Sequence, residues 1–365
     1  MVTTSFRGGG AEFVALTWAG WLASQGHTVG LATTTVHDDG VAPDRVTHIP
    51  LEGDSTLATV RALRAAVKGR FDVILSLQSL PNLVSLAAAR GLRHVAVVIS
   101  ERNITSRENE PLRLPERVRR AVALRWYRRA DMAIAVSHAV GAELVSAYRV
   151  PADRVVVVPN PAGQRAEARG TRETSAQPDG VLRLALPMRL VPQKRVNLAV
   201  DAAAVLRARG IDARLLCFTT ESGMADLAAH AEASGVPVES PGWVDDWAAA
   251  TPAGSVVVLP SYREGFGNIL VEAAQAGFPS VAVSNSFGVG DALVPGLSGQ
   301  FALVGTADAL ADAVESAARV DMTRARDWGR RFSTNESGRL LTDALSSAIH
   351  RMDAPHFGLR ERDFA

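Results

Sequence analysis

The chain has 365 residues, of which 47% are hydrophobic and 21% charged, so it is long enough for two or three domains that each bury a core. This composition excludes wholesale disorder, and the formal net charge of +1 provides no global field for binding a polyanion. Because no run of 18 uncharged apolar residues is present, no membrane-spanning helix is expected.

The first residues and the cysteine usage bear on the cellular compartment. Residues 1–10 lack the apolar stretch of a signal peptide, and Cys217, the single cysteine, has no partner for an internal disulfide. We therefore expect a cytoplasmic protein. Lys68 and Lys194 stand out because every other long basic side chain is arginine.

The first 160 residues alternate short β-branched runs with longer segments rich in alanine and leucine. The predicted strands are 28–33, 73–77, 95–99, 132–136 and 155–158, and the predicted helices are 11–24, 57–68, 83–90 and 115–129. Strands that alternate with helices indicate βαβ units and a mostly parallel sheet.

Residues 161–180 lack apolar periodicity and are predicted to be a linker, after which the same alternation restarts over residues 181–350. There the predicted strands are 182–186, 213–219, 256–260 and 280–283, and the predicted helices are 197–209, 224–234, 268–276, 306–319 and 323–350. Residues 351–365 form a tail. The prediction is two doubly wound, Rossmann-like α/β domains facing across a cleft, with the last helix able to pack back on the first domain.

A glycine-rich turn leads into the first long helix. Gly8, Gly9 and Gly10 would let the backbone and the helix start approach a phosphate or a sugar. The spacing fits neither a P-loop nor the full dinucleotide pattern, so a plain strand-to-helix turn is an equal alternative.

Two cations lie on the loop that follows the first strand of the second domain. Arg189 and Lys194 are five positions apart, at the carboxyl end of a strand, which suits a diphosphate. The alternative is a solvated basic loop.

Residues 261–272 carry the strongest signal. Glu264 lies in the turn after an apolar strand, and Glu272 lies eight residues later in the following helix. Gly265 and Gly267 would open the start of that helix to a phosphate. Because Glu272 lies in an apolar run, its burial requires hydrogen-bond donors; a helix cap with one surface glutamate is the simple alternative.

These motifs together resemble the family-4 retaining glycosyltransferases with the GT-B fold, in which two glutamates are separated by seven residues. The likeness covers nearly the whole chain to about residue 350. It implies that Arg189 and Lys194 hold the diphosphate of a donor, that Glu272 binds the ribose hydroxyls, and that Glu264 faces the transferred sugar.

The resemblance also implies a wider site. Its donor-binding residues would be Gly9, Gly10, Arg189, Lys194, Trp243, Val244, Glu264, Gly265, Phe266, Gly267, Asn268 and Glu272. In the first domain, the sequence from Ser100 to Asn103 resembles a subgroup that uses N-acetylhexosamine donors, as does the stretch from Pro159 to Pro161. Glu101 is therefore a candidate contact for acceptor or sugar, and the catalytic candidates are Glu264, Arg189, Lys194 and Glu101.

The implied activity is that of a hexosyltransferase-type glycosyltransferase. It would move a sugar, with retention of configuration, from a nucleoside-diphosphate sugar such as UDP-N-acetylhexosamine to a hydroxyl of a lipid-linked or small-molecule acceptor. No Asp-x-Asp pair stands out, so neither a metal nor another cofactor is expected, and no nucleic acid is an expected partner. The alternatives are a catalytically silent protein of the same fold that binds nucleotide or carbohydrate, and a nicotinamide-dependent dehydrogenase.

Two interpretations are open for an arginine-rich segment, residues 111–129. It contains a single acid, Glu116, and could bind an anionic lipid-phosphate acceptor or the inner face of a membrane. Since its sequence has no clear apolar face, a solvated basic helix is the alternative.

Overall fold

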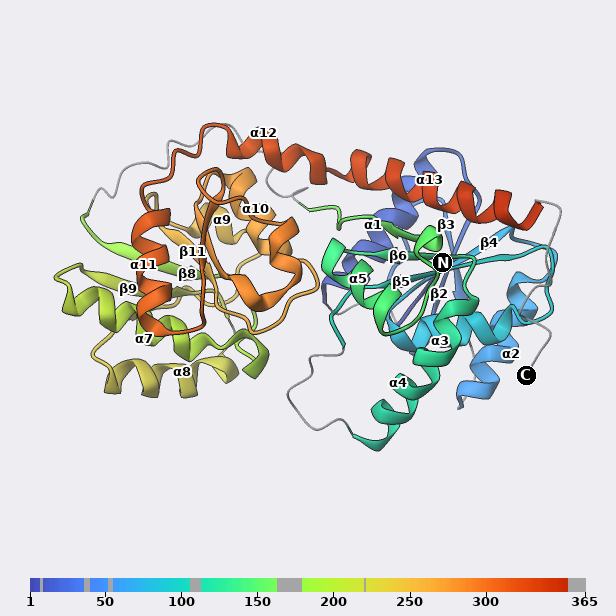
Figure 1. Cartoon of the computed structure of the whole chain (residues 1–365), viewed down its shortest axis with the longest axis horizontal. Helices are drawn as coiled ribbons and strands as arrows, with labels where there is room; N and C mark the ends of the chain where they lie inside the picture. Colours follow the sequence, from blue (N-terminus) through green and yellow to red (C-terminus); the bar gives the residue numbers. More distant parts are fainter. Residues whose placement is uncertain are drawn as a thin grey trace. The chain divides into compact units, whose positions relative to one another are not determined.

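The computed structural model describes residues 1–6, 9–35, 40–51, 55–105, 113–162, 179–219 and 221–353. The chain divides into two compact units (Figure 1). Unit 1 comprises Met1–Pro161 together with Thr334–Ala365, and unit 2 comprises Ala162–Ser333. Most of the predicted linker, residues 163–178, lies outside the described residues.

Unit 1 is built on a seven-stranded parallel sheet in the order β3-β2-β1-β4-β5-β6-β7. Its strands are β1 (Val2–Thr3), β2 (Val29–Thr33), β3 (Val46–Pro50), β4 (Val73–Leu77), β5 (Ala96–Glu101), β6 (Met132–Ala135) and β7 (Val155–Val157). Its helices are α1 (Gly10–Ser24), α2 (Thr56–Val67), α3 (Ser79–Ala88), α4 (Leu114–Trp126), α5 (His138–Ser146) and α13 (Thr334–Asp353), with 3₁₀ turns η1 (Tyr127–Arg129) and η2 (Ala152–Arg154).

The two faces of this sheet bury alternate side chains of each strand. Leu75 and Leu77 of β4 join the core beneath α1 and α13, which includes Trp18 and Leu341. Ile74, the residue before Leu75, is also buried and lies on the opposite face, where α3 packs against β4 and β5. Burial on both faces explains why these strands are nearly continuous apolar runs.

Unit 2 contains a six-stranded parallel sheet in the order β10-β9-β8-β11-β12-β13. Its strands are β8 (Leu182–Leu186), β9 (Ala213–Cys217), β10 (Val238–Glu239), β11 (Val256–Leu259), β12 (Ser280–Val283) and β13 (Gly299–Ala302). Its helices are α7 (Val196–Ala208), α8 (Glu221–Ala233), α9 (Trp247–Ala250), α10 (Asn268–Ala276), α11 (Ala307–Ala317) and α12 (Ala325–Gly329), with 3₁₀ turns η3 (Pro192–Lys194), η4 (Ser284–Ser286), η5 (Gly288–Asp291) and η6 (Arg330–Phe332).

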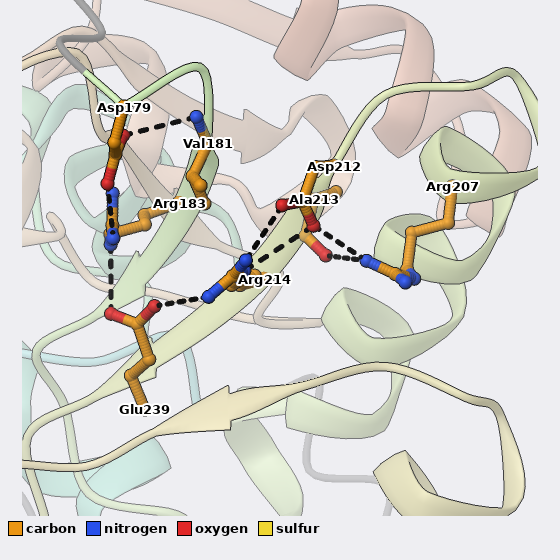
Figure 2. A network of polar contacts seen from close by, with 8 residues as sticks. All are labelled: Asp179, Val181, Arg183, Arg207, Asp212, Ala213, Arg214 and Glu239. Atoms are coloured by element: carbon orange, nitrogen blue, oxygen red, sulfur yellow. Dashed lines mark hydrogen bonds and ion pairs between the residues drawn. The ribbon is translucent and has the colours of Figure 1, made fainter.

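A network of ion pairs fastens the outer strands of unit 2 at the edge where β8 and β9 begin (Figure 2). Arg183 of β8 donates to Glu239 of β10 and to Asp179, with both distances 2.8 Å. Arg214 of β9 pairs with Asp212 at 2.8 Å and approaches Glu239 at 3.6 Å. The hydrogen bond from Arg183 holds the pKa of Asp179 at about 2. This edge is opposite the carboxyl ends of the strands, so the network is structural.

Each sheet has one point where the strand order reverses. In unit 1 the reversal lies between β1 and β4, and in unit 2 it lies between β8 and β11. Loops that leave the carboxyl ends of such strands diverge in opposite directions and leave a crevice, where ligands bind in doubly wound folds. The loops after these four strands are therefore where a site is expected.

The predicted helix over residues 323–350 is wrong as a single element. Two short elements, α12 and η6, are followed by extended Ser333 at φ −63° and ψ 160°, and α13 then begins at Thr334. The break coincides with the boundary between the units, because α12 and η6 belong to unit 2 while α13 completes unit 1. Helical propensity alone does not reveal a change of packing partner.

Candidate functional site

The loops after β8 and β11 meet at the reversal point of unit 2. Lys194 ends η3, and its Nζ lies 2.5 Å from Oε1 of Glu264, with the two side chains 18% and 10% exposed. Gln193 links the same loops, since its carbonyl accepts from Tyr262 N–H at 3.2 Å and its Nε2 donates to the Arg263 carbonyl at 2.9 Å. Two residues that are 70 positions apart thus form one charged pair.

A third loop, after β12, supports Glu264 from behind. The Glu264 amide donates to the Ser286 carbonyl at 2.8 Å, and the Gly288 amide donates to the Glu264 carbonyl at 3.1 Å. A Cβ on Gly288 would lie 2.0 Å from the Gly265 carbonyl oxygen, so only glycine permits this approach. Phe287, at φ 67°, holds a left-handed conformation that is costly for a bulky residue and is fixed by these bonds.

The turn that opens α10 presents unpaired amides. The N–H groups of Gly265, Phe266 and Gly267 donate to none of the residues that the structure describes. Gly267, at φ 91°, turns the chain into α10, which begins at Asn268. The Phe266 ring is buried against Phe332, with centroids 5.4 Å apart, so only its backbone can face a ligand. Free amides at a helix N-terminus attract anions.

Arg189 lies on the loop after β8, three residues beyond the end of the strand. Its side chain is exposed and makes no hydrogen bond or ion pair to any other described residue. Because Arg189 lies on the same loop as Lys194 and is not paired with a described carboxylate, its guanidinium is available to bind a phosphate.

Glu272 is half-buried on α10 and accepts a hydrogen bond from Nε1 of Trp247 at 3.3 Å. Trp247 was not singled out from the sequence. A buried indole N–H requires an acceptor, and that requirement was the available signal. Trp243 is 63% exposed, whereas Val244 packs against the core cluster that contains Trp247. The turn residue Gly242, at φ 80°, presents the Trp243 ring to solvent.

The reversal point of unit 1 places Glu12 at the glycine turn. The Glu12 carboxylate accepts from the Gly9 amide at 3.0 Å and from Nε2 of Gln78 at 3.1 Å. Thr4 Oγ1 donates to the side-chain amide oxygen Oε1 of Gln78 at 2.5 Å. Because a carboxylate already occupies the start of α1, whose first residue is Gly10, this turn favours a hydroxyl-bearing ligand over a phosphate. Gly8 lies outside the described residues.

Glu101 ends β5 and is only 4% exposed. Its carboxylate accepts from the Tyr127 hydroxyl at 2.9 Å and from the Arg102 amide at 3.1 Å. Burial raises the pKa of Glu101 to about 7, although both hydrogen bonds oppose that rise. This carboxyl group lies within unit 1 rather than on its surface.

Arg102 lies next to Glu101 and joins the segments at which the chain leaves and re-enters unit 1. Its guanidinium donates to Ser100 Oγ at 3.0 Å and to Asn160 Oδ1, and it lies 4.9 Å from the centroid of the Trp18 ring. Trp18 Nε1 donates to Ser337 Oγ of α13 at 3.0 Å. Ser337 in turn donates to the Pro159 carbonyl at 2.7 Å, so both segments converge on one buried cluster.

Within the part of the chain that the structure describes, no group of three or more His, Cys, Asp or Glu side chains is arranged to hold a metal ion. None of the described helices is both long and apolar enough to cross a membrane.

Both units of the chain are similar to known protein families. Residues 8–162 match Glycosyltransferase Family 4, and residues 183–319 match the Glycosyl transferases group 1 family. The two matches fall on the two units in turn. The chain belongs to the family-4 glycosyltransferases.

Individual relatives of this family agree with the assignment. The D-inositol 3-phosphate glycosyltransferase of Pseudarthrobacter chlorophenolicus is 35% identical over 214 residues, which is 53% of this chain and 50% of that protein. The alignment thus spans about half the length of the curated relatives that the chain matches.

Solved structures share the fold over almost the whole chain. Sucrose-phosphate synthase from Thermosynechococcus elongatus gives a TM-score of 0.80 at 16% identity, covering 96% of this chain and 98% of that one. Anabaena HepE in complex with UDP and glucose gives 0.73 at 18% identity, covering 95% and 99%. The fold of this glycosyltransferase family member is therefore GT-B, as predicted.

Proposed function

We propose that the protein is a retaining, hexosyltransferase-type glycosyltransferase that transfers a sugar from a nucleoside-diphosphate sugar to an acceptor hydroxyl. The observation that carries the proposal is the Lys194–Glu264 pair beside the free amides of residues 265–267, at the reversal point of unit 2. A diphosphate bound at this point would meet both positively charged side chains and free backbone amides.

The donor diphosphate would be held by three kinds of positive group. Lys194 supplies an ammonium, Arg189 an unpaired guanidinium, and the start of α10 its free amides and helix dipole. These groups stabilise the charge that develops on the diphosphate as it leaves, an effect of about 2–4 kcal/mol for one donor. No metal would be required, and activity should therefore persist in a chelator.

The Lys194–Glu264 pair would change partners when the donor binds. In the free protein the ammonium and the carboxylate neutralise each other at 2.5 Å. A bound diphosphate would draw Lys194 toward itself, and Glu264 would then accept hydrogen bonds from hydroxyls of the transferred sugar. Departure and attack on the same face of that sugar would retain its configuration without a protein nucleophile.

The nucleoside would lie toward Glu272. A carboxylate can accept hydrogen bonds from both ribose hydroxyls, and Trp247 Nε1 would orient it for them. The exposed Trp243 ring after Gly242 offers a stacking surface for the base. We infer a UDP-N-acetylhexosamine donor, from the likeness of residues 100–103 and 159–161 to a subgroup that uses such donors.

The acceptor would be a hydroxyl-rich small molecule or a lipid-linked glycoside. The Glu12 carboxylate and the Gln78 amide at the reversal point of unit 1 suit hydroxyl groups. A phosphorylated cyclic polyol is the first candidate, because the name of the curated relative identifies D-inositol 3-phosphate as its substrate. The same Glu12 carboxylate would repel a dinucleotide pyrophosphate, which argues against the dehydrogenase alternative.

Mass spectrometry of products provides the test. The protein is incubated with a panel of nucleoside-diphosphate sugars and with polyol-phosphate and lipid-linked acceptors, and the anomeric configuration of any product is read by NMR. We expect a product with UDP-N-acetylhexosamine and turnover at least about 30-fold lower for Lys194→Ala and for Arg189→Ala. Nucleotide binding without a product across the panel would instead favour the catalytically silent alternative.

A further inference from the structure

Arg195 holds a costly backbone conformation directly beside the lysine of the proposed donor site. It follows η3 and precedes α7, with φ 49° and ψ 44° in the left-handed region. Glycine adopts this region readily, whereas a long side chain stays there only where its surroundings fix it. The Arg195 amide donates to the Pro192 carbonyl at 3.1 Å, and its carbonyl accepts from the Leu198 amide at 2.9 Å. Because these bonds are local to the turn, the further constraint must come from the side chain.

The Arg195 guanidinium fills a space that Gly305 leaves open in the loop after β13. A Cβ on Gly305 would lie 2.3 Å from Nη2, 2.7 Å from Nη1 and 2.9 Å from Cζ of Arg195. Nη2 donates to the Gly305 carbonyl at 3.4 Å, and Arg195 has no carboxylate partner among the described residues. Burial lowers the pKa of this guanidinium below its ordinary value. The contact therefore requires a long side chain at position 195 and none at position 305.

The loop after β13 is in turn connected to the loops that carry the site. Its Leu303 carbonyl accepts from Ser284 Oγ, in the loop after β12, at 2.9 Å. Two residues further on, the Ser286 carbonyl accepts from the Glu264 amide at 2.8 Å. Since Glu264 pairs with Lys194, whose neighbour makes the contact described above, the loops after β8, β13, β12 and β11 form a closed ring.

Breaking this ring at Gly305 would release residue 195 to the right-handed helical region, which is the ordinary conformation for arginine at a helix start. That change rotates the peptide that joins residue 195 to Lys194, so it redirects the Lys194 side chain. Helix α7 would otherwise remain in place, because it packs against α11 (Figure 1). The expected consequence is a displaced ammonium group in a folded protein.

We propose that Arg195 is a positioning residue of the donor site, whose guanidinium, seated at Gly305, fixes the left-handed turn that aims Lys194 at the diphosphate. The guanidinium lies at the loop after the edge strand β13 and not at the reversal point, so it acts through Lys194. The identity of the ligand in this inference rests on the proposed function, whereas the contact between Arg195 and Gly305 does not.

Gly305→Ala breaks the contact without changing residue 195. The φ of Gly305 lies outside the left-handed region, so alanine is tolerated and displaces only the flexible end of the arginine. We expect UDP to bind at least about 5-fold more weakly in calorimetry, with Tm changed by less than about 2 °C. Gly290→Ala is the matched control, because a Cβ there meets nothing within 4 Å, and its UDP affinity should change by less than about twofold.

Arg195→Gly removes the side chain but permits the left-handed conformation. It should weaken UDP binding as much as Gly305→Ala does without lowering Tm, and the two changes combined should have no further effect. Arg149→Gly is the control, since Arg149 is an exposed arginine of unit 1 with a similar φ of 55°. A lower Tm with unchanged UDP affinity in both variants at positions 195 and 305 would mean a purely structural role and would overturn the proposal.

The Lys194→Ala background separates positioning from direct binding. In that background Arg195→Gly should change UDP affinity by less than about twofold, because the residue through which it acts is gone. Arg189→Ala should still weaken UDP binding there, since Arg189 is proposed to contact the diphosphate itself. An undiminished effect of Arg195→Gly would show that its guanidinium binds the ligand directly, and the proposal would be wrong.

Hydrogen exchange in the absence of ligand separates this inference from the proposed function. Arg195→Gly and Gly305→Ala should each increase exchange at the amides of residues 194–198 and 286–288, whereas Arg149→Gly should not. If the wild type bound no UDP, the proposed function would fail, and exchange alone would still confirm or refute the contact. Exchange that is the same in all three variants and the wild type would overturn the role of Arg195.

Discussion

At the scale of single residues, the two units hold their carboxylates in different ways. Glu264 lies beside a cation, whereas Glu101 is buried next to phenol and amide donors that compensate only part of its desolvation. A carboxylate beside a cation can exchange that positive partner for another. A desolvated one responds to pH instead, so each glutamate leads to a different experiment.

The first experiment separates the two glutamates of the proposed donor site. Because Glu264 neutralises Lys194 in the free protein, Glu264→Gln releases the ammonium for a diphosphate. We expect UDP affinity to be unchanged or up to about 10-fold higher, and turnover to fall about 100-fold or more. Glu272→Gln should mainly weaken UDP binding, by about 10-fold, since it removes a contact common to ground and transition states.

Calorimetric titration with UDP, beside turnover measurements, distinguishes these outcomes. Glu232→Gln, at an exposed position in the last turn of α8, is a suitable control for the loss of one carboxylate. Loss of UDP binding in Glu264→Gln with normal binding in Glu272→Gln would reverse the proposed orientation of the donor.

The second experiment follows stability against pH at Glu101. The pKa of Glu101 is raised from an ordinary value of 4.5 to about 7 in the folded protein. Between pH 4.5 and pH 7 the folded state therefore binds more protons at this residue than the unfolded state does. The free energy of unfolding should therefore fall as pH rises from about 5 to 7.5, by on the order of 2–3 kcal/mol. Glu101→Gln should remove most of this slope. Urea midpoints across that range provide the measurement, and parallel profiles for the two proteins would rule out the titration.

At the scale of elements, the site depends on backbone contacts between loops. The loop after β12 approaches the loop after β11 so closely that no side chain fits at Gly288. Gly290, two residues later, has open space around the position of a Cβ. One turn thus contains both a critical glycine and its own control.

We expect Gly288→Ala to displace the Glu264 backbone and to abolish UDP binding, with a loss of stability of a few kcal/mol. Gly290→Ala should leave UDP affinity within twofold of the wild type and stability within about 0.5 kcal/mol. Thermal unfolding with and without UDP measures both effects. Similar behaviour of the two variants would mean that the contact between these loops does not support the site.

At the scale of the whole molecule, α13 joins residues far apart in the sequence into one core. Leu341 is fully buried with Trp18 and the inner strands of unit 1. Leu341→Ala should reduce the stability of unit 1 by about 2–5 kcal/mol, while Ser347→Ala on the exposed face of α13 should have little effect. Hydrogen exchange resolved by unit is the measurement; loss of protection confined to unit 2 would contradict the assignment of α13.

The sequence predicts most of the fold because buried parallel strands are continuous apolar runs. Strands such as Val73–Leu77 and Leu182–Leu186 are found with the predicted bounds. Four strands were missed. The two-residue strands β1 and β10 are too short for any periodicity. Strands β3 and β13 lie at the edges of their sheets and are only partly buried, so they lack the continuous apolar run that marks an inner strand. The ion pair between Lys194 and Glu264 could not be predicted from the sequence either. It forms because β8 and β11 are neighbours in the sheet, and the order of strands is not visible in the sequence.

The partition of the chain has a consequence for the order in which it folds during synthesis. Unit 2 is one continuous segment, whereas unit 1 lacks α13 until synthesis has passed residue 353, where that helix ends. Until then the sheet face that includes Leu77, Val98 and Ile134 is only partly covered, by α1. The second unit can therefore close its core before the first, which reverses the usual amino-to-carboxyl order, and the nascent chain exposes an apolar sheet that chaperones would recognise.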